Sequence, residues 1–205
     1  MALEVLPLLE ADLPEYCRIH FTAFTKGMSQ FFGPASSARD QNFLDSQRKQ
    51  MLEDPTVFFL KAVDPQTGAI IGCAKYHKFN PPKSKDEIKA SYAARPPPEG
   101  ANVEAWSDLF SWLEEARTKY LGGKTCWFLS ILIADPANGR RGAGSALLHW
   151  GNERADKDKL PIFLEASPMA RPLYERFGYE IIEEREFDLS KYGGQGKDYN
   201  TAMVR

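Results

Sequence analysis

Three glycines and two arginines lie close together in one short turn, where the sequence reads GRRGAGS. Gly142 and Gly144 lack side chains, so an anion can closely approach the backbone N–H groups there. The first N–H groups of a helix have no partner inside the helix, and the helix dipole adds partial positive charge to them. Arg140 and Arg141 can add charge-assisted hydrogen bonds. These residue types at this spacing predict a phosphate or pyrophosphate site.

The segments on both sides of the turn support this interpretation. The apolar run from Cys126 to Ala134 has the length and composition of a buried strand. No Lys follows the glycines, which argues against a nucleotide triphosphatase, and their spacing does not fit a dinucleotide-binding turn. Apolar residues then return at helical spacing: Ala143, Ala146, Leu147 and Trp150. The order is therefore strand, glycine-rich turn, helix.

This constellation resembles the GNAT superfamily of acyl-CoA-dependent N-acyltransferases. The family signature is a strand ending in aliphatic-x-Asp-Pro, then Gln/Arg-x-x-Gly-x-Gly/Ala, then a helix. Asp135 and Pro136 match it, and Gly139 stands where the family usually has Gln or Arg. The resemblance implies that acetyl-CoA binds here, with its thioester carbonyl polarised by strand-end N–H groups and its pyrophosphate held at the turn. The expected contact residues are Leu132, Ile133, Ala134, Arg140, Arg141, Gly142, Ala143, Gly144 and Ser145.

A second segment resembles the same family. Leu173-Tyr174 and Phe177-Gly178-Tyr179 match aliphatic-Tyr-x-x-x-Gly-Phe, with a tyrosine in place of the usual Phe. By this resemblance Tyr174 protonates the departing CoA thiolate; packing alone is the alternative. A thiol has a pKa of about 8.5 and a phenol about 10, so the transfer needs no large perturbation. Ser167 falls where the family often has Asn facing the pantetheine arm, and it is also a candidate helix cap.

The general base is less well defined. A protonated alkyl amine has a pKa of about 10.4 and must lose a proton before it attacks a thioester. Many relatives use a Glu on or near the signature strand, but this strand contains no carboxylate. The candidates are Glu165, His77 acting through a water, or a residue of the long segment before the strand. Cys126 is disfavoured as a nucleophile because no His is adjacent to it in sequence. His20 is expected to be a packed or surface residue.

Before the signature, the pattern predicts a strand at residues 3–9 and a helix from Leu13 to about Phe24, with Asp12 as N-cap and Glu15 as capping-box partner. A loop at 26–38 contains Phe31 and Phe32, which either line an acceptor pocket or cap the core. The remaining elements are a helix at 39–53 and a hairpin with strands at 56–63 and 69–79.

Residues 80–122 form an insertion relative to the simplest GNAT plan. Five prolines break up residues 80–100, and a helix capped by Asn102 is expected at 103–120. The insertion is interpreted as a lid or acceptor-recognition element, with a passive decoration as the alternative. Later elements are a strand at 161–166, a helix starting near Arg171 and ending at Gly178, a strand at 179–186, a mobile stretch at 191–198 and a strand at 201–205.

The resulting fold class is α/β (α+β): one GNAT-like domain over residues 1–205, with a mixed, mostly antiparallel sheet flanked by helices. The net charge of −2 gives no case for nucleic acid. Three separated cysteines predict neither a disulfide framework nor a metal site. No signal peptide and no apolar run of about 18 residues is present, so we expect a protein of the cytoplasm, or of the nucleus as well, without a membrane partner.

The predicted function is direct transfer of an acetyl group from acetyl-CoA to a primary amine of a small molecule or peptide. One alternative is a CoA-binding module without catalysis, such as a sensor or scaffold, because the strand lacks a carboxylate. A nucleotide-phosphate binder unrelated to CoA is a further alternative. The acceptor and the oligomeric state are not predicted.

Overall fold

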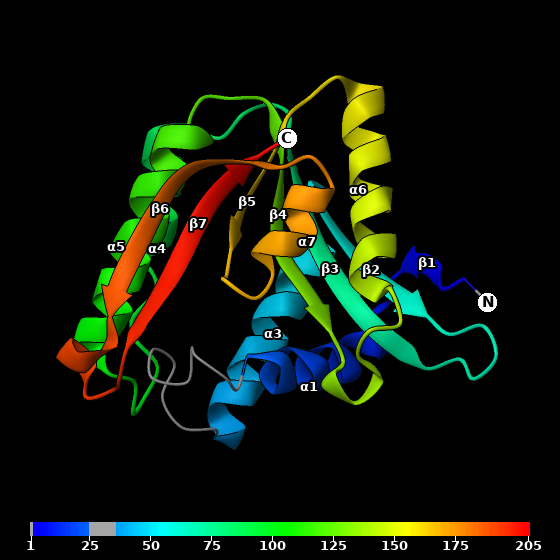
Figure 1. The fold of residues 1–205 in the computed structure, drawn as a ribbon, viewed down its shortest axis with the longest axis horizontal. Coiled ribbons are helices and arrows are strands. Elements are labelled where there is room, and N and C mark those ends of the chain that lie inside the picture. The colour runs from blue at the N-terminus through cyan, green and yellow to red at the C-terminus, as the bar shows by residue number, and fades with distance from the viewer. Residues whose placement is uncertain (1, 25–35) are drawn as a thin grey trace. The chain divides into compact units, whose positions relative to one another are not determined.

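The computed structural model describes residues 2–24 and 36–205, so the expectation for Phe31 and Phe32 lies outside the described residues. The chain divides into two compact units, each assembled from distant parts of the sequence. The first contains residues 2–24, 36–78 and 127–162, and the second contains 79–126 and 163–205. Seven mostly antiparallel strands with flanking helices make a mixed α/β fold, as predicted (Figure 1).

The first unit contains four strands in chain order, and the register of the first two pairs is antiparallel. They are β1 (Glu4–Pro7), β2 (Val57–Val63), β3 (Ile70–Phe79) and β4 (Cys126–Ala134). Position at the edge explains how β1 accommodates Pro7, which has no N–H to give to a second neighbour. The β2–β3 hairpin closes where the Asp64 N–H donates to the Ala69 carbonyl at 3.0 Å, as the sequence predicts.

Three helices cover this part of the sheet: α1 (Leu13–Ala23), α3 (Ser37–Glu53) and α6 (Ala143–Asp158). Successive side chains of β3 reach different helices, because neighbouring residues of a strand point to opposite faces of the sheet. The Tyr76 hydroxyl donates to the Leu147 carbonyl of α6 at 3.1 Å. The Lys75 ammonium donates instead to Gln47 of α3 at 2.8 Å. α1 packs against α3 (Figure 1).

The core of the first unit lies among α1, α3 and the strands. Its buried members are Leu8, Leu13, Tyr16, Cys17, Ile19, Phe59, Cys73 and Ile133. His20 lies beside this cluster, with its ring stacked on Phe43 at 4.3 Å between centroids. No described residue gives a hydrogen bond to its Nδ1. The histidine is a packing residue, as the sequence predicts.

The environment of His20 predicts a pH-dependent stability. Burial, followed by the charges of Lys75 and Arg39, lowers its pKa from 6.5 to about 3. Between these two pKa values His20 is protonated in the unfolded chain but not in the folded chain. The free energy of unfolding therefore falls as the pH drops below 6.5. We expect His20→Leu to reduce the slope of unfolding free energy against pH, between pH 6 and 4, by about 1.4 kcal/mol per unit. Urea unfolding at several pH values measures this slope, and equal slopes for both proteins would contradict the assignment.

Two helix starts in the first unit differ from the prediction. Asp12 does not cap α1, because its carboxylate accepts from the Leu9 N–H at 2.8 Å and the Lys61 ammonium at 2.6 Å. Glu15 is no capping-box partner, since it forms an ion pair with Arg18. α3 begins two residues earlier than predicted, because the Ser36 hydroxyl accepts from the Arg39 N–H at 3.2 Å.

The second unit contains three strands in the order β5-β7-β6, and both pairings are antiparallel. They are β5 (Ile162–Ala166), β6 (Glu180–Asp188) and β7 (Lys197–Val204). The last strand begins at Lys197 and not at residue 201 as predicted, so β7 includes the end of the stretch at 191–198 predicted to be mobile. Tyr192 is buried before it, and its hydroxyl donates to the Asp108 carboxylate.

The insertion contains two helices where the sequence predicts one. α4 (Lys85–Ala93) lies beside α5 (Val103–Tyr120) in Figure 1. The Ser84 hydroxyl accepts from the Glu87 N–H at 3.2 Å, and the Glu87 carboxylate accepts from the Ser84 N–H at 2.7 Å, so a capping box starts α4 between the flanking prolines. The predicted cap of α5 is confirmed, because the Ala105 N–H donates to the Asn102 side-chain oxygen at 3.0 Å. The short α7 (Arg171–Arg176) follows β5. Its C-cap is Phe177, and Gly178 comes next with a φ of 81°.

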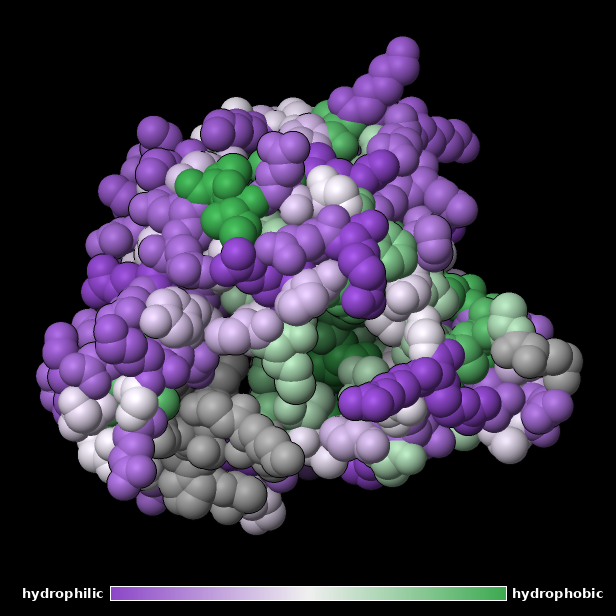
Figure 2. Space-filling model, viewed as in Figure 1, coloured by the Kyte–Doolittle hydropathy of each residue, from purple (hydrophilic) through white to green (hydrophobic). Residues whose placement is uncertain are grey.

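Hydrophilic side chains dominate the face shown in Figure 2. None of the helices in the described ranges is long and apolar enough to span a membrane.

Candidate active site

The glycine-rich turn joins β4 to α6. Gly142 immediately precedes α6 with a φ of 86°, and Arg140 also has a positive φ of 64°. The first bond of the helix runs from the Ala146 N–H to the Gly142 carbonyl at 3.0 Å. Among the described residues, no hydrogen bond uses the four N–H groups from Gly142 to Ser145. Gly142 is exposed, while Gly144 and Ser145 are half-buried, so the turn presents unpaired donors that an anion can reach.

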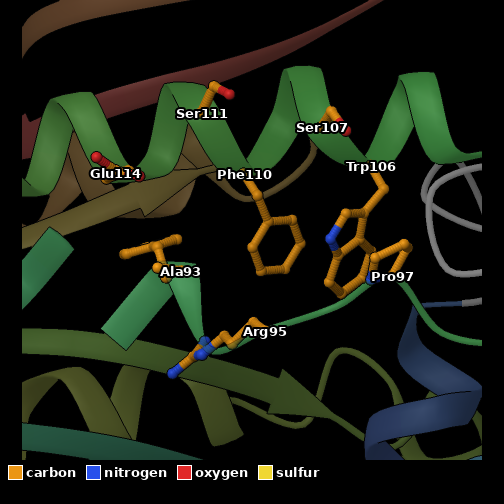
Figure 3. A pocket seen from close by; sticks show the side chains of 9 residues that line it. Ala93, Arg95, Pro97, Trp106, Ser107, Phe110, Ser111 and Glu114 are labelled. Carbon is orange, nitrogen blue, oxygen red and sulfur yellow. The ribbon is translucent and has the colours of Figure 1, made fainter. Parts of the chain in front are cut away.

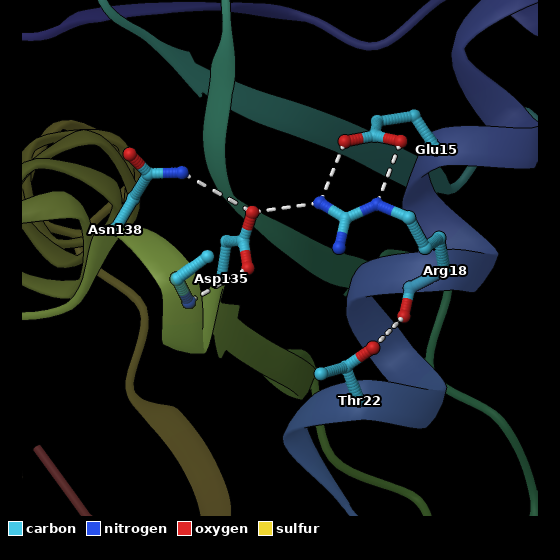
Figure 4. Close-up of polar contacts among 6 residues, drawn as sticks. Glu15, Arg18, Thr22, Asp135 and Asn138 are labelled. Carbon is cyan, nitrogen blue, oxygen red and sulfur yellow. Dashed lines mark hydrogen bonds and ion pairs between the residues drawn. The ribbon is translucent and has the colours of Figure 1, made fainter.

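A buried carboxylate fixes the start of this turn (Figure 4). Asp135 is 3% exposed and accepts hydrogen bonds from the Arg18 guanidinium at 2.7 Å, the Ala137 N–H at 3.0 Å and the Asn138 amide at 3.2 Å. Burial alone would raise the pKa of Asp135, but these bonds lower it below its usual value. Glu15 orients Arg18 through two bonds of 2.9 and 2.7 Å. The Asp-Pro signature is therefore a structural anchor for the turn.

A glycine on β3 lets the turn pack closely against the sheet. A Cβ at Gly72 would meet the Ile133 carbonyl oxygen at 2.7 Å and the Ala143 Cβ at 3.0 Å. Real Cβ atoms do not come this close to a backbone oxygen. Any larger residue at this position would push the start of α6 away from the strand end. The predicted contact residues Ile133 and Ala143 are both buried, whereas Ala134 is exposed and Leu132 half-buried.

The two arginines of the turn have different surroundings. The Arg141 guanidinium donates to the Asp64 carboxylate at 2.8 Å. A hydrogen bond from the Gln66 N–H and then this guanidinium hold the pKa of Asp64 below its usual range. Arg140 is exposed and has no ion pair or hydrogen bond with any described residue. Arg140 can therefore bind an anion without losing such a bond. Arg141 can do so only by giving up or dividing its hydrogen bond with Asp64.

Tyr174 lies on α7 and is 5% exposed. Its ring packs edge to face against Tyr179, with centroids 5.8 Å apart. Burial, and then the charge of Glu165, raises the pKa of Tyr174 above its usual value, so the phenol keeps its proton at neutral pH. No hydrogen bond within the described part of the chain uses its hydroxyl. The hydroxyl is therefore available to a substrate atom, while the raised pKa makes it a weaker acid than a free phenol.

Glu165 forms an ion pair with Arg117. Its two oxygens accept from the Arg117 guanidinium of α5, at 2.7 Å from Nε and 2.9 Å from Nη2. The Glu165 side chain is only 6% exposed. Burial alone would lower the pKa of Arg117, but Glu165 raises it above its usual value. Because the guanidinium occupies both oxygens of this carboxylate, the contacts argue against Glu165 as the base.

His77 is the other predicted base. It is half-buried, and its ring stacks on Phe128 with centroids 5.6 Å apart. Its Nε2 lies 3.1 Å from the Ser130 Oγ, which donates to the Lys75 carbonyl at 3.1 Å. Because the Ser130 hydroxyl donates to that carbonyl, its oxygen accepts from Nε2–H. The lone pair of the ring then lies on Nδ1, which is buried. The sequence reasoning did not single out Ser130, because an isolated serine in an apolar strand gives no signal of a histidine partner.

Two smaller predictions concern Ser167 and Cys126. Ser167 does not cap a helix with its side chain, because the N–H groups of Ala170 and Arg171 bond to its carbonyl instead. Its hydroxyl has no hydrogen bond with the described residues. Burial raises the pKa of Cys126 to about 11, which agrees with its exclusion as a nucleophile. Within the described ranges, no cluster of His, Cys, Asp and Glu suited to a metal is present.

Known proteins resemble this chain in both sequence and fold. Residues 120–189, which include β4, the turn, α6 and α7, match the family model of the acetyltransferase (GNAT) domain. Three solved structures match over nearly their whole lengths. The mosquito arylalkylamine N-acetyltransferase-like 5b is 17% identical with a TM-score of 0.64, and the match covers 100% of this chain and 99% of that one. The Drosophila melanogaster polyamine N-acetyltransferase is 14% identical with a TM-score of 0.68, and the match covers 99% of both chains. A PaiA N-acetyltransferase from Thermoplasma acidophilum in complex with coenzyme A is 13% identical with a TM-score of 0.53, and the match covers 100% of this chain and 99% of that one. At these identities the likeness shows the shared fold.

Proposed function

We propose that this chain, whose residues 120–189 match the GNAT acetyltransferase domain, transfers the acetyl group of acetyl-CoA directly to a primary amine of a small molecule or peptide. The main support is the run of N–H groups from Gly142 to Ser145 at the start of a helix, which form no hydrogen bond with the described residues. Pyrophosphate is the anion that such a cradle suits. Arg140 supplies a further positive charge beside it.

The proposed reaction has one transfer step. The amine nitrogen attacks the thioester carbonyl carbon, the C–S bond breaks, and the sulfur leaves as a thiolate. N–H groups near the end of β4, from Leu132 to Ala134, polarise the carbonyl oxygen, and Ser167 binds the pantetheine arm. Tyr174 gives its proton to the thiolate, and His77 takes the proton of the amine through a water, which has to reach its buried Nδ1. Holding both substrates together lowers the entropic part of the barrier.

The proton donor is tested by replacing Tyr174 with phenylalanine. We expect kcat to fall about 100-fold, since general acid catalysis contributes at least this much. The affinity for acetyl-CoA should change less than threefold, because the phenol acts on the sulfur only as the bond breaks. Steady-state kinetics together with calorimetric titration of acetyl-CoA measure the two effects. A variant with unchanged kcat would remove Tyr174 from the mechanism.

A screen of amine acceptors tests the proposed function itself. The arylalkylamine and polyamine N-acetyltransferases with this fold suggest the first two acceptor classes, so tryptamine and spermidine are suitable probes, with a lysine-containing peptide as a third. Free thiol released from acetyl-CoA is measured with and without each amine. Amine-dependent release supports the proposal. Tight acetyl-CoA binding without release by a broad amine panel would favour a non-catalytic CoA-binding module.

A further inference from the structure

The insertion contains a pocket of about 230 Å³. Residues from the end of α4, from the proline-rich segment after it and from one side of α5 line it (Figure 3). None of them belongs to the residues proposed above for acyl transfer. Small-molecule pockets for drug-sized ligands have volumes of about 300–1,000 Å³, so this one suits a smaller molecule.

One wall of the pocket is aromatic. Trp106 and Phe110 project from α5 toward the proline-rich segment in Figure 3, and their rings stack with centroids 3.8 Å apart and planes 16° apart. Tyr92 of α4 meets Phe110 edge on, with centroids 6.0 Å apart. Stacked rings form a flat apolar surface on which an aliphatic or aromatic side chain can pack.

Three polar side chains of the pocket have no hydrogen bond or ion pair with the described residues. Tyr92 is 8% exposed, yet no described residue gives its hydroxyl a hydrogen bond, and a buried polar group in that state is destabilising. The Arg95 guanidinium lies over the Tyr92 ring at 5.6 Å and forms no ion pair with a described carboxylate. Glu114, on the α5 side, forms no ion pair with a described cation. The pocket therefore presents one positive charge, one negative charge and one unsatisfied hydroxyl.

We propose that this pocket binds a free α-amino acid with an apolar side chain. Its carboxylate pairs with Arg95, its ammonium pairs with Glu114, and its side chain packs on Trp106 and Phe110. The Tyr92 hydroxyl donates to the carboxylate. A simple anion would leave Glu114 without a partner and a simple cation would leave Arg95 without one, whereas a small zwitterion satisfies both. The proposal does not depend on acyl transfer, because it concerns binding alone.

Calorimetric titration of the full chain with three matched probes, in the absence of acetyl-CoA, tests the proposal. L-leucine carries both charges, 4-methylpentanoate only the carboxylate, and 3-methylbutylamine only the ammonium. We expect leucine to bind at least tenfold more tightly than either fragment, because each lost charge-assisted bond is worth about 1.5–3 kcal/mol. No measurable leucine binding, or equal binding of the three probes, would overturn the proposal.

Variants assign the binding to the pocket. Arg95→Met and Glu114→Gln should each weaken leucine binding at least tenfold, and Tyr92→Phe should weaken it by a smaller factor. Glu115→Gln and Lys89→Met are matched controls, because both side chains are exposed on α5 and α4 and do not line the pocket. Unchanged thermal midpoints show that the variants are folded. Equal losses of leucine affinity in the two controls would overturn the proposal. Acetylation of leucine that is abolished by Arg95→Met would also overturn it, because the pocket would then be part of the acceptor site.

Discussion

Replacing Gly142 with valine is expected to weaken acetyl-CoA binding at least 100-fold. Gly142 has a φ of 86°, which costs a residue with a side chain about 1–2 kcal/mol and a β-branched residue more. Valine would move the backbone toward negative φ and turn the unpaired N–H groups of residues 142–145 away from the anion. Losing two charge-assisted hydrogen bonds, at about 1.5–3 kcal/mol each, corresponds to a loss of 100-fold or more. Calorimetric titration with acetyl-CoA measures it. Gly144→Val should act in the same direction.

Two further glycine variants separate this effect from general damage. Gly139→Ala tests the same turn without strain, because Gly139 has a φ of −57° and a Cβ there meets only the Pro136 oxygen at 3.6 Å. Gly193→Val introduces similar strain outside the turn, at a φ of 81° with no atom within 4 Å of the new Cβ. We expect near-normal acetyl-CoA affinity in both, with some loss of stability in Gly193→Val. Normal affinity in Gly142→Val would show that the pyrophosphate does not bind at this turn.

Local signals in the sequence were sufficient to predict the elements that carry the turn. The bounds predicted for β4, Cys126–Ala134, are those observed, because a buried strand between glycines and an Asp-Pro pair is defined by its immediate neighbours. The cap of α5 by Asn102 is local in the same sense. α4 was missed because its capping box at Ser84 lies between prolines that suggest irregular structure. Asp12 shows the opposite error, a predicted cap that does not form. Its carboxylate accepts from the ammonium of Lys61, which is 49 positions away.

The surroundings of the site residues could not be read from the sequence. Arg141 and Asp64 are 77 positions apart, and Arg18 and Asp135 are 117 positions apart. No spacing rule connects such residues, because only the folded sheet brings their strands and helices together. The pattern could therefore identify Glu165 as a carboxylate in the right segment, but not that Arg117 binds both of its oxygens. The chemistry of a carboxylate depends on its partner, which is a property of the fold.

The Arg117–Glu165 pair leads to the second large expected effect. Arg117→Met leaves the Glu165 carboxylate, 6% exposed, without its cation. Removing one partner of a buried pair costs about 3–5 kcal/mol, because the remaining charge stays desolvated. We expect this loss in the free energy of unfolding from urea titrations at neutral pH. Lys119→Met is the matched control on the same helix. The side chains of its ion pair with Glu183 are 60% and 36% exposed, so this variant should lose far less stability than Arg117→Met.

The double variant Arg117→Met with Glu165→Leu distinguishes a stranded charge from lost packing. With both charges replaced by apolar side chains, no desolvated carboxylate remains, and the stability should return to within about 1–2 kcal/mol of the original chain. If the double variant is as unstable as Arg117→Met alone, the arginine contributes through its packing, including its position 5.6 Å from the Tyr92 ring, and the electrostatic account of Glu165 is wrong. If Arg117→Met alone is stable, the carboxylate is solvated or protonated without its partner. Glu165 would then return as a candidate for the general base.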